Sequence, residues 1–133
     1  MRYLLDTNTA SHMIRKDNQA VDQWRAKVAI SELAVSTVTE GELRFGAARV
    51  PQALRLRAAI EEYLLDVTVL PWDSNAAREY GELRASLERD GRTIGSLDMM
   101  IAAHALALGF ILVSSDSAFR RIKRLKVEDW TKA

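Results

Sequence analysis

Residues 96–116 read SLDMMIAAHALALGFILVSSD, and this stretch decides the fold. Ser96 can cap a helix that carries Asp98 and continues to about residue 108, and Gly109 is suited to end it. Nearly every position of this helix is apolar, so we expect it to be buried. Residues 110–113 follow as an entirely apolar strand, which is typical of a parallel sheet covered on both faces.

Short apolar strands alternate with longer helices along the rest of the chain. We expect strands at residues 3–5, 34–36, 66–70, 110–113 and 126–128. We expect helices at about residues 9–16, 18–29, from 37, from Pro51 to 64 and from 74 to 90, with a short basic helix before the last strand. This order predicts right-handed crossovers and a three-layer α/β/α fold with a mainly parallel sheet of about five strands.

Composition limits the chemistry. The 133 residues, 48% of them hydrophobic and 28% charged, fit a single domain spanning residues 1–133. The chain has no cysteine, which excludes thiolate catalysis and cysteine-ligated metals, and only two histidines, His12 and His104. A bound metal would therefore take mostly oxygen ligands. We expect His104 to lie in the core.

The sequence carries no secretion or membrane signal. Its most apolar stretch, residues 94–110, contains Asp98 and His104 and is shorter than the roughly 20 apolar residues of a membrane-spanning helix. We therefore expect a cytoplasmic protein without a membrane partner.

Acidic residues follow several of the predicted strands. In an open parallel sheet, sites form outside the carboxyl ends of the strands, which is where Asp6, Asp98 and Asp116 are expected. Crowded carboxylates need a shifted pKa or a counter-cation, and an oxygen-only site suits Mg²⁺ or Mn²⁺. Glu40 and Glu42 also lie near this edge. They point about 200° apart on a helix, so only one can face the site, and periodicity does not decide which.

Several segments, in this order and spacing, resemble one family, the PIN-domain ribonucleases, and more closely the VapC toxins of bacterial toxin–antitoxin pairs. The matching segments are LLDTN at residues 4–8, TEGEL at 39–43, GSLDMMIAAHA at 95–105 and LVSSD at 112–116. Ser114 stands where the family usually has threonine. The resemblance selects Glu42 over Glu40, and it implies that Asp6, Glu42, Asp98 and Asp116 are the catalytic and metal-binding residues.

The resemblance also implies an activity and partners. The chain is expected to be an Mg²⁺- or Mn²⁺-dependent endoribonuclease toxin that cleaves cellular RNA, such as transfer RNA, through activated water. It is expected to form a homodimer and to be silenced by a VapB-type antitoxin, whose arginine would pair with the acids. The antitoxin would cover helices at residues 9–29 and 37–64, and the apolar residues expected to line that groove are Met13, Ile14, Val21 and Trp24.

Two basic clusters could contact a polyanion. The first contains Arg44, Arg49, Arg55 and Arg57, and the second contains Arg120, Arg121, Lys123, Arg124 and Lys126. Charged helices are also often merely solvated faces. The residues chosen as candidate substrate contacts are Asn8, Ser114, Arg44 and Arg49.

Two other functions remain open. Residues 6–10 are close to the D-x-D-x-T motif of haloacid-dehalogenase phosphatases, but Asn8 replaces the second aspartate and Ala10 the threonine. The chain could also be a non-catalytic nucleic-acid-binding module on the same fold, although such a copy would be expected to lose acids that this chain retains.

Overall fold

The computed structural model describes residues 2–132 and contains a five-stranded, wholly parallel sheet. The strand order is β3-β2-β1-β4-β5, so the chain begins at the centre of the sheet and builds outward in both directions. The strands are β1 (Tyr3–Leu5), β2 (Leu33–Ser36), β3 (Thr68–Leu70), β4 (Ile111–Val113) and β5 (Val127–Glu128). The predicted α/β/α architecture is confirmed.

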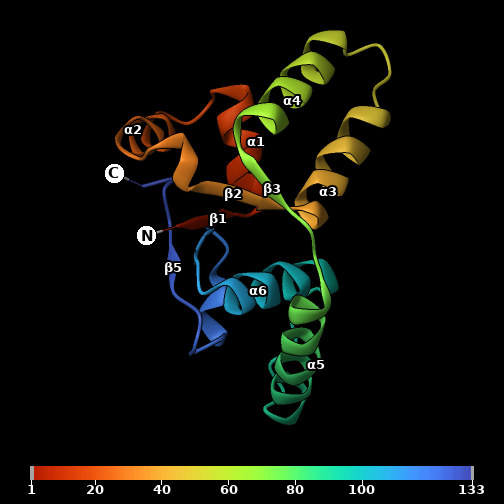
Figure 1. Cartoon of the computed structure of the whole chain (residues 1–133), viewed down its shortest axis with the longest axis vertical. Coiled ribbons are helices and arrows are strands. Elements are labelled where there is room, and N and C mark those ends of the chain that lie inside the picture. The colour runs from red at the N-terminus through yellow and green to blue at the C-terminus, as the bar shows by residue number, and fades with distance from the viewer. Residues whose placement is uncertain (1, 133) are drawn as a thin grey trace.

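Helices cover both faces of the sheet (Figure 1). The helices are α1 (Thr7–Arg15), α2 (Gln19–Lys27), α3 (Thr37–Ala48), α4 (Leu54–Asp66), α5 (Ser74–Arg89) and α6 (Ser96–Leu108), with 3-10 turns η1 (Ile30–Glu32) and η2 (Ser117–Arg121). The first four helices pack in one hydrophobic cluster, and α5, α6 and η2 pack in another. Within the described residues, no helix is long and apolar enough to cross a membrane.

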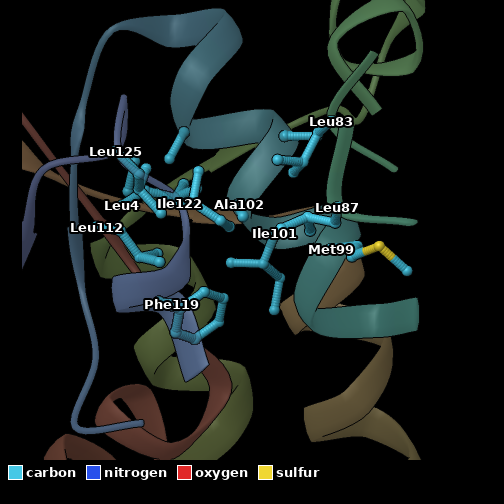
Figure 2. Close-up of a cluster of buried hydrophobic side chains, with 13 residues drawn as sticks. Leu4, Leu83, Leu87, Met99, Ile101, Ala102, Leu112, Phe119, Ile122 and Leu125 are labelled. Atoms are coloured by element: carbon cyan, nitrogen blue, oxygen red, sulfur yellow. The ribbon is translucent and has the colours of Figure 1, made fainter. Parts of the chain in front are cut away.

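Successive side chains of the central strands point to opposite faces of the sheet, and this alternation produces the two hydrophobic clusters. In β1, Leu4 belongs to the cluster around α6, and the next residue, Leu5, belongs to the cluster around α1. In β4, Leu112 and Val113 divide in the same way. Figure 2 shows the first cluster, where α6 lies against α5 and η2. Because α6 is buried between the sheet and α5, its first turn is held firmly at the sheet edge.

Several predicted helix starts are wrong by a few residues. The first helix begins at Thr7 rather than at about residue 9, and Asp6 caps it because its carboxylate accepts a hydrogen bond from the Thr9 amide. Gly95 rather than Ser96 is the N-cap of α6. Pro51 lies in the turn before α4, which begins only at Leu54.

His104 lies in the buried part of α6, as predicted, but it is not a satisfied core residue. Its side chain is 2% exposed and its Nδ1 atom lacks a hydrogen-bond partner within the described chain. Burial lowers the pKa of His104, although the Asp73 carboxylate opposes that shift. The neutral imidazole is therefore favoured in the folded protein.

This arrangement makes His104 a source of acid sensitivity. Between about pH 7 and pH 5 the unfolded chain takes up a proton on this histidine that the folded chain resists, so the free energy of unfolding falls as the pH falls. We expect His104→Leu to reduce that fall and to stabilise the protein at about pH 5.5 by about 1 kcal/mol or more, because an unsatisfied polar atom is removed. Urea unfolding at several pH values measures this, and parallel curves for the two proteins would refute it.

Candidate active site

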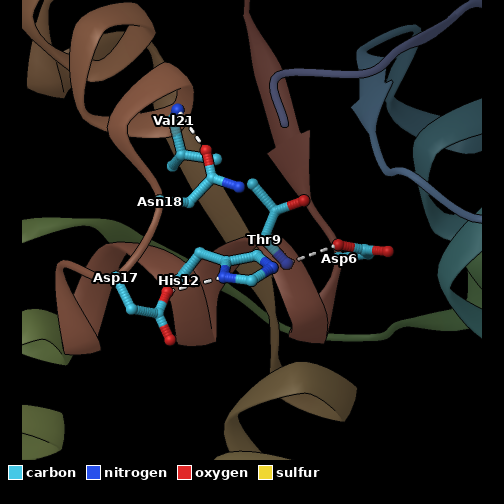
Figure 3. A network of polar contacts seen from close by, with 6 residues as sticks. All are labelled: Asp6, Thr9, His12, Asp17, Asn18 and Val21. Carbon is cyan, nitrogen blue, oxygen red and sulfur yellow. Dashed lines mark hydrogen bonds and ion pairs between the residues drawn. The ribbon is translucent and has the colours of Figure 1, made fainter. Parts of the chain in front are cut away.

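Asp6 comes directly after the central strand β1. Its backbone amide donates to the Val113 carbonyl at 3.1 Å, so the β1–β4 pairing continues one residue past the end of β1. One carboxylate oxygen accepts a hydrogen bond from the Thr9 amide at 2.8 Å (Figure 3). The other oxygen points away from α1 in that view. The side chain is thus fixed on one side and free to bind a ligand on the other.

Asp116 follows the neighbouring strand, β4. The Ser114 hydroxyl, which is buried, accepts a hydrogen bond from the Asp116 amide at 3.0 Å and so stabilises the turn. The Asp116 carboxylate accepts from the Ala118 amide at 2.9 Å and caps η2, while the residue remains exposed. Ser114 is therefore placed to support Asp116.

Asp98 lies in the first turn of α6 and is affected by all three of the other acids. Partial burial raises the pKa of Asp98, and the negative charges of Asp116, Asp6 and Glu42 raise it further. Asp98 and Glu42 lie in α6 and α3, whereas Asp6 and Asp116 are the N-caps of α1 and η2, and the fold brings the charges of the other three acids within range of Asp98.

The structure distinguishes the two glutamates that periodicity could not. The Thr7 hydroxyl donates to Glu42 at 2.6 Å and lies 3.3 Å from the hydroxyl of Thr39. Glu40 instead accepts a hydrogen bond from Arg44 at 3.0 Å. Glu42 therefore faces the acidic edge, and Glu40 belongs to an ion pair on the surface.

Comparison with known proteins agrees with this geometry. The sequence profile of the PIN domain matches residues 3–125. This chain belongs to the PIN-domain family. It is 35% identical to the tRNA(fMet)-specific endonuclease VapC of Shigella flexneri, over 98% of this chain and 99% of that protein. It is 34% identical to ribonuclease VapC2 of Haemophilus influenzae, over 98% of each chain.

Solved structures give the same result. DNA-bound VapBC from Salmonella typhimurium contains a chain that superposes with a TM-score of 0.90 at 33% identity, covering 98% of both chains. VapBC2 from Rickettsia felis, bound to a promoter DNA fragment, also superposes with a TM-score of 0.90, at 29% identity, covering 98% of this chain and 99% of that one. Membership of the PIN-domain family decides against the haloacid-dehalogenase alternative.

The substrate-contact candidates of this PIN domain differ in their availability. The Arg44 guanidinium donates to both Glu40 and Glu61, so two carboxylates already occupy it. Arg49 lies over the Phe45 ring at 5.0 Å and lines a groove that also contains Glu42. Asn8 is exposed on the first turn of α1. Arg49 and Asn8 thus remain accessible, whereas Arg44 would have to exchange partners.

Thr7 is a further functional candidate, which the sequence does not link to Glu42. Its hydroxyl links α1 to Glu42 on α3, 35 residues away, and so fixes the distance between two of the acids. The segment LLDTN at residues 4–8 placed it beside Asp6. The sequence does not show that Thr7 contacts Glu42, because that contact depends on how α1 packs against α3.

The acids fit a hard divalent cation in chemistry, but they do not enclose one. Within residues 2–132, no group of three or more acidic or histidine side chains stands close enough together to hold an ion unaided. Mg²⁺ commonly uses one or two carboxylates and fills its remaining positions with water and substrate phosphate. Burial raises the pKa of Asp98 and the neighbouring acids raise it further, and a bound cation would offset the repulsion between those acids.

Neutralising Asp98 should therefore stabilise the metal-free protein. Because the folded state raises the pKa of Asp98, the ionised group lowers the free energy of unfolding at neutral pH, and this cost disappears as the pH falls. We expect Asp98→Asn to have a higher Tm than the wild type at pH 7 in EDTA. Saturating Mg²⁺ should then raise the Tm of the wild type more than that of the variant.

Asp22→Asn is the matched control, because Asp22 lies exposed in the first turn of α2. We expect it to give no rise in Tm. A Tm for Asp98→Asn at or below that of the wild type in EDTA would contradict charge crowding at the sheet edge.

Proposed function

We propose that this chain is a divalent-metal-dependent endoribonuclease, the VapC-type toxin of a toxin–antitoxin pair. The observation that carries the proposal is the convergence of Asp6, Glu42, Asp98 and Asp116 at the carboxyl edge of the sheet. Burial raises the pKa of Asp98, and the charges of the other three acids raise it further. Relatives that match nearly the whole chain are named as VapC ribonucleases. The retention of all four acids argues against a non-catalytic nucleic-acid-binding module.

The four carboxylates have different tasks in this proposal. Asp6, which follows the central strand, and the partly buried Asp98 would be the principal ligands for Mg²⁺, with Mn²⁺ as a substitute. Glu42 is oriented by Thr7, and Asp116 is held by its own turn at the exposed rim. A cation held there would supply an activated water and would stabilise charge on the phosphoryl group. The protein side chains place the scissile phosphodiester against that edge.

We propose structured RNA, such as transfer RNA, as the substrate. The Shigella flexneri relative is named for a transfer RNA, and it matches 98% of this chain. Asp116 is exposed at the rim, so a polynucleotide can reach the acids without threading into an enclosed cavity.

We propose that a VapB-type antitoxin covers the groove beside the acids. This groove of about 320 Å³ lies between α1, α3 and α4, and Glu42 and Thr7 are at its polar end. The apolar residues that line it are Ile14, Leu43, Phe45, Leu56 and Ile60. An arginine from the antitoxin could pair with the carboxylates and block the site. The similar chains of known structure belong to VapBC from Salmonella typhimurium and VapBC2 from Rickettsia felis, which supports a partner of this kind.

Three of the four residues expected to line the antitoxin groove do not line it, and only Ile14 does. Val21 is fully buried in the core. Trp24 stacks on Trp130 with a centroid distance of 5.4 Å. Ile14 lines the groove beside the acids, while Met13 lines only a neighbouring hollow that also contains Ile14. We retain the homodimer as part of the proposal, and light scattering of the purified protein tests it.

Loss of a principal ligand should abolish cleavage. We expect Asp6→Asn to lower the rate of RNA cleavage in saturating Mg²⁺ by more than about 100-fold. Loss of a residue that only hydrogen-bonds to a metal ligand costs about 10- to 100-fold, so loss of a ligand itself should cost more. The fold should survive because asparagine also caps helices well. EDTA should stop cleavage by the wild type, and Asp22→Asn should cleave normally. A wild-type rate for Asp6→Asn would refute the proposed site.

The two glutamates provide a second, internal test. We expect Glu42→Gln to reduce cleavage at least about tenfold more than Glu40→Gln, because only Glu42 is bound to Thr7 at the acidic edge. The same single-turnover assay serves both variants. Greater damage from Glu40→Gln would show that α3 presents its other side to the substrate.

A further inference from the structure

A basic hollow lies between the end of α5 and the segment that joins η2 to β5. Its volume is about 580 Å³. The charged residues that line it are Arg92, Arg121, Lys123, Arg124 and one acid, Asp90. Three of the four cations belong to the second basic cluster of the sequence, which the proposed catalytic site does not use. We call this feature the basic pocket.

One wall of the basic pocket is fixed by the way α5 ends. Gly91 has a φ of 66°, which favours glycine, and its amide donates to the Glu88 carbonyl at 3.1 Å. The Arg92 amide donates to the Leu87 carbonyl at 2.8 Å. These two bonds form a Schellman motif, so the backbone of Arg92 has a defined position just beyond the helix.

The other wall is fixed by apolar side chains. Ile122 and Leu125 are buried in the core around α6 (Figure 2). The residues between and beside them, including Arg121 and Lys123, are therefore left exposed. Both walls carry cations on an ordered backbone, which lowers the entropy cost of binding an anion.

Most cations of the basic pocket are free to bind an anionic ligand, unlike Arg44, which is paired with two carboxylates. Within residues 2–132, no ion pair involves Arg92 or Lys123. Arg121 donates one bond to the Thr93 carbonyl at 3.0 Å, and that neutral partner leaves its charge uncompensated. Arg124 is paired with Glu79 at 3.3 Å. Arg92, Arg121 and Lys123 therefore retain positive charge for a ligand.

The basic pocket adjoins the acidic edge along the chain. Arg121 ends the 3-10 turn that Asp116 caps, so about 10 Å of helix axis separates them. The bond from Arg121 to Thr93 joins η2 to the loop that leads into α6 and Asp98. The two segments that carry Asp116 and Asp98 thus also form the basic pocket.

We propose that Arg92, Arg121 and Lys123 form a phosphate-binding subsite for the RNA strand on the α5 side of the cut. This inference rests on the proposed ribonuclease function. The acidic edge repels a polyanion, so affinity must come from cations beside it, and guanidinium groups bind phosphate in a bidentate manner. A strand whose scissile phosphate lies at the carboxylates would place a neighbouring phosphate within reach of these cations.

The test measures RNA binding without cleavage. In an Asp6→Asn background, the probe is a fluorescein-labelled single-stranded RNA of mixed sequence and about 12 nucleotides, within the usual range of single-strand site sizes. Fluorescence anisotropy gives Kd at several salt concentrations. The test variant is Arg92→Ala/Lys123→Ala, whose side chains have no ion pair to lose.

The matched control is Arg2→Ala/Lys27→Ala. It removes the same charge from exposed positions that lie outside both basic clusters, one directly before β1 and one on α2. We expect the test variant to weaken RNA binding at least about tenfold more than the control at low salt. The slope of log K against log salt should become shallower by about 1.4, because each single-strand phosphate contact contributes about 0.7.

Two results would overturn the subsite. One is a Kd and a salt slope that match those of the control. The other is normal RNA binding together with lost affinity for a polyglutamate peptide, which would assign the basic pocket to an acidic polypeptide. Arg92→Lys in place of Arg92→Ala should restore part of the binding, because it returns the charge.

The cleavage assay separates this proposal from the proposed function. RNA cleavage by the otherwise wild-type chain, combined with unchanged binding by the test variant, would refute the subsite and leave the nuclease standing. Binding that depends on the basic pocket in a protein that cleaves no RNA with any divalent metal would support the subsite and refute the nuclease.

Discussion

The parallel register of β1 against β4 is the constraint on which the site depends. Leu5 pairs with Val113, and the Asp6 amide adds one more bond to the Val113 carbonyl. Because both strands end at the same level, their first polar successors, Asp6 and the turn that carries Asp116, are held at one edge. A slip of one residue would exchange the faces of Leu4 and Leu5 and mix the two cores.

The helices then determine which acids can join these two. Helix α6 is buried against the sheet, so its first turn delivers Asp98 between the strand ends. Thr7 connects α1 to Glu42 and orients the fourth acid. Each placement uses core packing or a neutral hydrogen bond rather than a countercharge. The carboxylates therefore remain uncompensated, and the cost is evident in the raised pKa of Asp98.

The basic residues nearest the acids in sequence are not the ones most free to bind substrate. Arg44 is only two residues from Glu42, but it turns back to Glu40 and across to Glu61. Arg92 is distant from the acids in sequence and lies on an ordered turn with no ion pair in the described chain. Proximity in sequence does not reveal which cations are already paired, so Arg44, the candidate substrate contact nearest Glu42 in the chain, is already bound to two carboxylates.

The sheet, the layers and three of the four acids could be predicted from local pattern. Apolar strands followed by an aspartate identify strand ends, and those ends share an edge in any parallel sheet. The choice between Glu40 and Glu42 needed either a family resemblance or the packed contact with Thr7, because periodicity along α3 is ambiguous. The exact first residues of α1 and α4 could not be predicted. Several neighbouring residues can form the hydrogen bonds that cap a helix, and only the folded structure shows which residue does so.

Diffraction from crystals soaked in Mn²⁺, measured at a wavelength where manganese scatters anomalously, shows whether the four acids hold a cation. We expect an anomalous peak at the carboxyl edge of the sheet, with oxygens of Asp6 and Asp98 at about 2.1 Å from the ion. Saturating Mn²⁺ with no peak at that edge, or with its only peak bound by other residues, would contradict this expectation.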